Sequence, residues 1–310
     1  SAMPAAVPPF RPLGALGLAV DTAAVSAPYD ELGSLARIAW VNSRAGIHER
    51  PPPGVAPIAA QTGGGELDKA PEVHFAFERS LAVGALGLPE QITVKGAELL
   101  AAPISVRAQV EKVQVEWRAS RPVALANGTA AGVRWEAEGW ARRSGPQTPP
   151  LSWRCTARAE YDGWVDLTVE IRAKSGEVQL QDVELRVPFR QQMSTYGLGM
   201  GFRGGRRPAR WAWTWDELRR GKRKYQRGDH AVWVGEVDGG LNVNLKGEEA
   251  EWEVPFGMEA KVPAAWSGTG GGDVLVVDEG GAAVVRARAG AHKVSPTKPL
   301  TLRFSLLITP

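Results

Sequence analysis

The sequence predicts an all-β protein with little helix, and three observations lead to that prediction. Short segments with apolar residues at every second position recur along the chain, which is the pattern of strands with one buried face. Helical periodicity is confined to two short stretches, residues 81–88 and 216–224, and the second is too charged to bury much. No alternation of strands with helices is visible, so we expect antiparallel sheets arranged as a sandwich or a barrel.

The chain opens with a segment that we do not expect to be part of the fold. Residues 1–20 are rich in Pro, Ala and Gly, which predicts a flexible lead-in. Residues 50–71 hold a Pro run and a Gly run and are typical of a long connection. We therefore expect one β-sandwich domain over residues 21–310, with residues 21–71 as a small N-terminal subregion of it.

The expected strands follow from their alternation. The segments with this pattern are 109–119, with a shift near Lys112, 132–140, 166–173, 178–189, 231–243, 272–277, 282–287 and 300–308. The dipeptide Asn127-Gly128 predicts a two-residue hairpin turn between two such runs.

The composition of the chain limits the kinds of functional site that it can form. A single cysteine, Cys155, rules out an intrachain disulfide framework and a thiolate metal cluster. The four histidines show no metal-ligand spacing, so we expect neither metal nor cofactor. No apolar run approaches the length needed to cross a bilayer, and we expect no membrane partner.

Tryptophan is the most unusual residue, with 12 Trp against 7 Phe and 4 Tyr. Trp211, Trp213 and Trp215 are spaced by two, so on a strand they would form an aromatic strip roughly 13 Å long. Three neighbouring arginines could supply polar contacts; they are Arg206, Arg207 and Arg210. The strip is either a ligand-binding surface or core that faces an opposing sheet, and the spacing does not decide between them.

A basic run follows at residues 219–227. Basic residues interleaved with aromatic ones can bind single-stranded nucleic acid, but a solvated loop has the same composition. The net charge of +3 is too small for a strong polyanion binder, and we do not expect nucleic acid as the partner.

Two carboxylates, Glu236 and Asp238, would share one face if they lay on a strand. Glycosidases work with two carboxylates, so this pair is a candidate catalytic pair. Any Glu-x-Asp in a strand has the same spacing, and Asp238 with the two following glycines is also typical of a turn.

Several motifs together resemble glycoside hydrolase family 123 and its uncharacterised glycoside-hydrolase-like relatives. The motifs are Gly197-Leu198-Gly199, Gly204-Gly205-Arg206-Arg207-Pro208, the Trp-x-Trp-x-Trp-Asp of residues 211–216, the segment 233–241, Tyr161-Asp162-Gly163-Trp164, the early segment 38–47 and the closing segment 306–310. The basic run at 219–227 departs from the pattern, because the motif usually passes directly from the Trp strip to the next strand.

The resemblance implies a large, supersandwich-like β-sandwich that precedes a (β/α)₈ barrel. The barrel of such proteins carries an Asp-Glu pair for substrate-assisted cleavage of N-acetylhexosaminides, and no barrel pattern is present in this chain. We therefore expect a non-catalytic N-terminal accessory domain that supports its own C-terminal barrel and contacts glycan. The resemblance also favours a secreted location, although no signal peptide is visible.

Two alternatives stay open. In the first, the chain is a free-standing module that binds glycan or single-stranded nucleic acid through the Trp strip and the basic run at 219–227. In the second, the chain is a hydrolase in its own right and uses Glu236 and Asp238.

Overall fold

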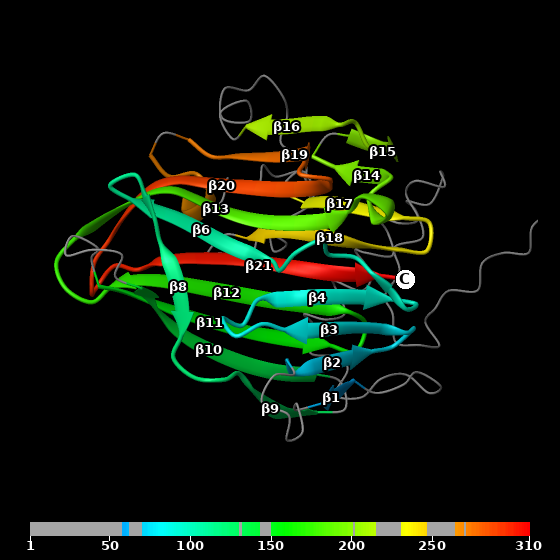
Figure 1. Cartoon of the computed structure of the whole chain (residues 1–310), viewed down its shortest axis with the longest axis horizontal. Coiled ribbons are helices and arrows are strands. Elements are labelled where there is room, and N and C mark those ends of the chain that lie inside the picture. The colour runs from blue at the N-terminus through cyan, green and yellow to red at the C-terminus, as the bar shows by residue number, and fades with distance from the viewer. Residues whose placement is uncertain are drawn as a thin grey trace, which may run out of the picture.

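The protein is a two-layer sandwich of antiparallel sheets, as a computed structural model shows (Figure 1). The structure describes residues 58–61, 70–129, 132–142, 150–200, 202–214, 231–246, 264–269 and 271–310. The lead-in predicted at residues 1–20 and most of the predicted subregion at 21–71 lie outside these ranges.

The N-terminal sheet has five strands in sequence order. They are β1 (Ala59–Gln61), β2 (Glu72–Phe75), β3 (Arg79–Val83), β4 (Pro89–Val94) and β5 (Ala97–Glu98).

The largest sheet has ten strands, in the order β15-β14-β17-β18-β21-β12-β11-β10-β8, with β9 also paired to β10. Its strands are β8 (Glu116–Ala119), β9 (Ala124–Thr129), β10 (Gly132–Arg142), β11 (Leu151–Glu160), β12 (Trp164–Ala173), β14 (Tyr196–Gly199), β15 (Phe202–Arg206), β17 (Ala231–Glu236), β18 (Gly239–Lys246) and β21 (Leu300–Thr309).

The third sheet has six strands, in the order β16-β19-β20-β13-β6-β7. They are β6 (Ser105–Val110), β7 (Val113–Gln114), β13 (Val178–Arg190), β16 (Arg210–Thr214), β19 (Asp273–Glu279) and β20 (Ala282–Val294). Within the described ranges, the helical elements are two 3₁₀ turns, η3 (Gln191–Met193) and η5 (Ala264–Trp266).

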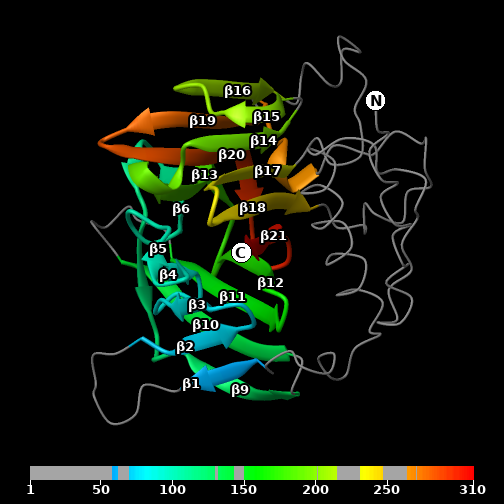
Figure 2. The same ribbon diagram turned by 90° about the vertical axis from the view of Figure 1, so that its right-hand side faces the viewer.

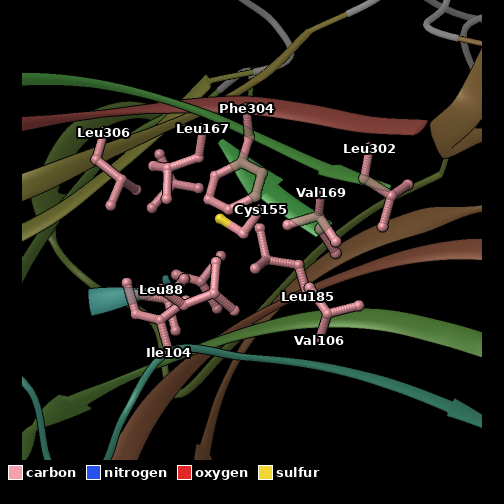
Figure 3. Close-up of a cluster of buried hydrophobic side chains, with 14 of the residues drawn as sticks. Leu88, Ile104, Val106, Cys155, Leu167, Val169, Leu185, Leu302, Phe304 and Leu306 are labelled. Carbon is pink, nitrogen blue, oxygen red and sulfur yellow. The ribbon is translucent and has the colours of Figure 1, made fainter. Parts of the chain in front are cut away.

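The five- and six-stranded sheets lie on the same side of the ten-stranded sheet and together form the second layer (Figure 2). The core fills the space between the layers. Leu302, Phe304 and Leu306 of β21 point toward Leu185 of β13 and Val106 of β6 (Figure 3). Every one of these side chains is at least 95% buried, and together they confirm the predicted antiparallel β-sandwich.

Cys155 lies in the middle of this core (Figure 3). Burial raises the pKa of its thiol to about 12, so the thiol stays protonated and inert near neutral pH. Two indoles on the same face, Trp135 and Trp153, donate their Nε1 protons to the carbonyls of Gly87 and Leu86, each at 2.9 Å. These bonds fasten the turn before β4 to the ten-stranded sheet.

Two local predictions were wrong. The stretch 81–88 is not helical: Leu81 and Val83 belong to β3, which is paired on both edges, and a turn follows. The hairpin expected at Asn127-Gly128 is displaced, because both residues continue strand β9 up to Thr129, which pairs with Gly132. In both places non-local strand pairing overrides the local pattern.

The shift expected near Lys112 is a tight turn. Glu111 and Lys112 both have left-handed backbone angles, with φ of 50° and 68°, and they connect β6 to β7. This combination is that of a two-residue hairpin, which reverses the chain where a single strand 109–119 would have continued.

Candidate functional site

The described part of the Trp strip, Trp211 and Trp213, lies on the edge strand of the six-stranded sheet, with both indoles turned inward. Trp211 and Trp213 of β16 are 9% and 3% exposed and pair in register with Val276 and Val274 of β19. The Trp211 ring meets Phe202 edge-on, with 5.2 Å between the ring centroids. Core packing therefore accounts for both indoles, and a ligand has no free ring face to stack on there. Trp215 lies outside the described residues, as does the basic run at 219–227.

The three arginines beside the strip have different environments. Arg206 and Arg210 are exposed. The side chain of Arg207 is only 4% exposed and donates to the carbonyls of Ser194 and Pro208, each at 3.0 Å. Its Nη2 atom also pairs with Asp278 of β19 at 2.5 Å. Arg207 thus connects the Gly-rich segment to the six-stranded sheet, and its donors are used within the fold.

The two candidate catalytic carboxylates do not share a strand. Glu236 is the last residue of β17, whereas Val237 and Asp238 form the turn that leads to β18. The Asp238 side chain is 80% exposed and lies 3.7 Å from the Lys95 ammonium. Because Asp238 is in the turn, the alternation that would place both carboxylates on one face does not apply.

A different group of polar side chains gathers on the ten-stranded sheet, on the face opposite the core. Strand pairing brings Asn244 of β18, Ser305 of β21, Asp166 of β12 and Arg158 of β11 into one row across four adjacent strands. We call this face the polar face. The other two sheets lie on the opposite side of the ten-stranded sheet (Figure 2).

Ion pairs and an indole occupy the middle of the polar face. The Lys246 ammonium pairs with the Asp166 carboxylate and lies 4.8 Å from the centroid of the Trp164 ring. Such a cation over an indole face is an attractive arrangement, and it holds the lysine above the sheet. The side chain of Lys246 is 9% exposed and that of Asp166 is 38% exposed, so the pair is reached from the aspartate side.

Glu160 ends strand β11 beside this pair. Its carboxylate accepts an ion-pair contact from Arg158 at 3.0 Å, and its side chain is 9% exposed. Burial raises the pKa of Glu160 to about 7, a shift that the Arg158 charge opposes and the charges of Asp162 and Asp166 reinforce. The carboxyl can therefore hold or release a proton near neutral pH.

Trp233 provides a second aromatic surface on this face. Its indole lies over two glycines, and a Cβ atom at Gly235 or at Gly240 would come within 2.5 Å of the ring. The Nε1 atom donates to the Thr309 hydroxyl at 3.0 Å, which fixes the ring direction. Gly235 and Gly240 thus form a flat surface, the glycine seat, on which the indole packs, whereas a Cβ atom at Gly239 would meet Val94 instead.

The sequence carried a signal for the polar face that we did not use. In three strands the residues between the apolar ones are uniformly polar: Asp166, Thr168 and Glu170; Asn242, Asn244 and Lys246; Thr301, Arg303 and Ser305. Which strands adjoin one another depends on long-range pairing, so the alternation alone could not bring these residues together.

The residues that the structure describes contain no group of three or more His, Cys, Asp or Glu side chains able to hold a metal ion. Nor does that part of the chain contain a helix long and apolar enough to span a membrane.

The fold and the polar face define a large two-layer antiparallel β-sandwich domain with a row of polar and aromatic side chains on its larger sheet. This domain belongs to a carbohydrate-active family: residues 68–310 match the family described as "Glycoside hydrolase 123, third domain". The match confirms the resemblance to family 123. The family description counts the matched unit as a third domain, whereas we had expected an N-terminal one, so the order of domains stays a prediction.

Two solved structures illustrate how weakly the chain resembles known ones. Galactose 1-epimerase from Lactobacillus acidophilus is 6% identical, with 81% of this chain and 97% of that one covered at a TM-score of 0.44. An alpha-mannosidase from Enterococcus faecalis is 10% identical, with 82% and 30% covered at a TM-score of 0.45. These overlaps do not bear on function. No curated protein sequence matches the chain.

Proposed function

We propose that this chain is a non-catalytic accessory domain of a glycoside-hydrolase-like protein, which supports a catalytic barrel and contacts glycan with its polar face. The observation that carries the proposal is the group formed by Lys246, Asp166 and the half-buried Trp233 on one face of the ten-stranded sheet. Membership of the family 123 third-domain family supports a sugar-handling role.

The chemistry of this face suits a neutral glycan. Saccharides offer hydroxyl groups that both donate and accept hydrogen bonds, together with C–H faces that pack on aromatic rings. The polar face offers both kinds of partner, and its central charges are paired, Lys246 with Asp166 and Arg158 with Glu160. A face with paired charges has no strong attraction for polyanions.

Support for a docked partner domain comes from one end of the sandwich. Phe77 and Val237 are 62% and 77% exposed, and apolar side chains exposed next to one another can form part of a contact surface. Their turns are adjacent, because Lys95 donates its backbone N–H to Glu78 at 2.8 Å and pairs its ammonium with Asp238. We assign this end to the contact with the catalytic barrel.

No specific observation favours the two alternatives. A free-standing binding module would use indoles that are buried in the core, namely Trp211 and Trp213. A hydrolase within this chain would use Glu236 and Asp238 as a pair. Glu236 lies at the end of a strand and Asp238 lies in the following turn, so strand alternation does not place them on one face.

The test compares this chain with the full-length protein. We expect the chain alone to bind neutral oligosaccharides in affinity electrophoresis and to release no product from aryl N-acetylhexosaminides, while the full-length protein hydrolyses them. Turnover by the chain alone that disappears in Glu236→Gln or Asp238→Asn would establish the hydrolase alternative instead. Absence of binding to any neutral saccharide would contradict the glycan contact.

A further inference from the structure

We infer that Trp140 and Arg118 form a binding site for an acidic saccharide residue, one that carries a single carboxylate. The inference rests on the proposed sugar-handling role and adds a second position on the polar face, near the β8 edge of the ten-stranded sheet. Trp140 of β10 lies directly opposite Arg118 of β8 and Ser152 of β11. Directly opposite residues on adjacent strands share a face and have their Cβ atoms about 5 Å apart, so the indole lies between the guanidinium and the hydroxyl.

The indole of Trp140 is accessible from solvent. Trp140 is 41% exposed, whereas every other tryptophan that the structure describes is buried or half-buried. Within the described residues no aromatic ring or cation stacks on this indole, and its Nε1 proton has no acceptor. The indole therefore offers a flat apolar area and a hydrogen-bond donor to a bound ring.

The charges around the indole turn this accessible surface into a specific site, since a single exposed apolar side chain is common on protein surfaces. Each nearby glutamate pairs with an arginine: Glu116 with Arg142 at 3.5 Å, Glu138 with Arg121 at 4.0 Å, Glu136 with Arg154 at 2.9 Å and Glu170 with Arg172 at 2.8 Å. Arg118 is exposed and has no ion-pair partner among the residues that the structure describes. The guanidinium directly opposite Trp140 thus carries an uncompensated positive charge.

A guanidinium beside an indole defines the ligand. A guanidinium binds a carboxylate through two parallel N–H···O bonds, and such charged bonds are roughly twice as strong as neutral ones. A sugar acid carries its carboxylate on the same ring whose C–H face packs on an indole, so one sugar residue reaches both Trp140 and Arg118. The Ser152 hydroxyl donates to the Arg172 carbonyl at 3.4 Å, and its oxygen can still accept a proton from a sugar hydroxyl.

Single-stranded nucleic acid also combines rings with negative charge, but it needs a basic groove that follows its backbone. Around Trp140 the described arginines other than Arg118 are paired with glutamates, so the charge available there suits one carboxylate.

The experiment measures binding of two acidic probes and of their neutral counterparts by titration calorimetry: sialyllactose against lactose, and digalacturonate against galactobiose. Oligothymidylate serves as the nucleic-acid probe. The variants are Trp140→Ala, Trp140→Phe and Arg118→Gln. The matched control is Arg134→Gln, because Arg134 is also exposed on β10 without an ion-pair partner among the described residues, yet it lies opposite Arg158 and Ala126 rather than an indole. Thermal unfolding verifies that each variant is folded at the assay temperature.

We expect the wild type to bind each acidic probe about tenfold or more tightly than its neutral counterpart, because the guanidinium gains a counterion. Arg118→Gln should abolish this preference, and Arg134→Gln should keep it. Trp140→Ala should weaken binding of the acidic probes about tenfold or more, whereas Trp140→Phe should retain part of the affinity because it keeps an aromatic face.

The failures are distinguishable. If neutral disaccharides bind as tightly as acidic ones and neither Arg118→Gln nor Trp140→Ala weakens any of them, this site is wrong while the neutral glycan contact stands. If Arg118→Gln and Arg134→Gln weaken the acidic probes equally, the attraction is general and the site is wrong.

Three further outcomes decide the ligand. If only the acidic probes bind and Trp140→Ala abolishes their binding, the site stands and the neutral glycan contact is wrong. If oligothymidylate binds more tightly than either acidic sugar and loses its affinity in Trp140→Ala, nucleic acid replaces the sugar acid as the ligand and the inference is overturned. If the wild type binds no saccharide, the glycan contact and this site both fail.

Discussion

The guanidinium of Arg79 occupies the space that a side chain at Gly163 would need: its Nη1 atom lies 2.6 Å from the position of a Cβ atom at that glycine. Arg79 donates to the carbonyls of Ala76 at 2.7 Å and Asp162 at 2.8 Å, and also to that of Ile308. One buried side chain on β3 therefore ties the five-stranded sheet to the turn between β11 and β12 and to the end of β21. Burial lowers the pKa of Arg79 to about 10, so the guanidinium stays charged at neutral pH.

The first prediction concerns this contact. Gly163→Ala should lower the free energy of unfolding by about 3 kcal/mol or more, because the new methyl group collides with Arg79 and with the Ile308 carbonyl, and the residue has φ of +88°. Gly176→Ala is the matched control, since Gly176 also has a left-handed φ, +64°, but nothing within 4 Å of the new atom. It should cost only about 1 kcal/mol, from backbone strain alone. Urea unfolding measures the cost of both substitutions, and equal costs would show that neither Arg79 nor the Ile308 carbonyl obstructs the new methyl group.

The second prediction separates core indoles from exposed ones. Trp213→Ala should cost about 3–5 kcal/mol of stability, because the indole is 3% exposed and its removal leaves a cavity. Trp140→Ala should cost well under half of that, because its side chain is 41% exposed on β10. Chemical denaturation of both variants checks the order. A Trp213→Ala protein of wild-type stability would show that this indole does not support the core.

Strand positions could be predicted from the sequence wherever one face of a strand is buried. The segments 166–173 and 178–189 fall within β12 and β13, because alternating apolar residues face a core whatever their partners are. The same rule placed the indoles of Trp211 and Trp213 on one face. It could not say whether that face was the core or the surface, since that depends on the opposite sheet.

The polar face could not be predicted, for a related reason. Asn244, Ser305 and Asp166 are far apart in the sequence, and only the pairing of β18, β21 and β12 makes them neighbours. In the sheet, β21 lies between β18 and β12, although it is the last strand of the chain. No periodicity within a single strand encodes that arrangement.

The third prediction concerns the glycine seat of Trp233. Gly240→Ala should displace the indole, break its bond to Thr309 and destabilise the protein by about 1–3 kcal/mol, because the Cβ atom would lie 2.5 Å from the ring. The same substitution in a Trp233→Leu background should cost clearly less, because the clash is gone. A double-mutant cycle measured by thermal unfolding tests this coupling. Additive effects of the two substitutions would contradict the proposed seat.

The last prediction concerns the pH dependence that Glu160 gives to stability. Burial raises the pKa of Glu160 from its ordinary value of 4.5 to about 7 in the folded protein. Below the lower value the carboxyl is protonated in both states and has no effect on stability. Between the two values the unfolded chain releases its proton first, so the free energy of unfolding falls as pH rises, by up to roughly 3 kcal/mol. Above the folded pKa the loss is complete and stays constant.

Glu160→Gln isolates this contribution, because the amide keeps the size of the side chain and does not titrate. Its stability relative to the wild type should increase between about pH 5 and about pH 8, as the wild type pays the desolvation of its carboxylate. The Arg158 ion pair, at 3.0 Å, opposes the effect, so Arg158→Met should enlarge the pH-dependent loss in the presence of Glu160. Denaturant unfolding at the two pH values measures these differences. A wild type and Glu160→Gln variant with parallel pH profiles would mean that Glu160 is ionised in the folded protein as readily as in the unfolded chain.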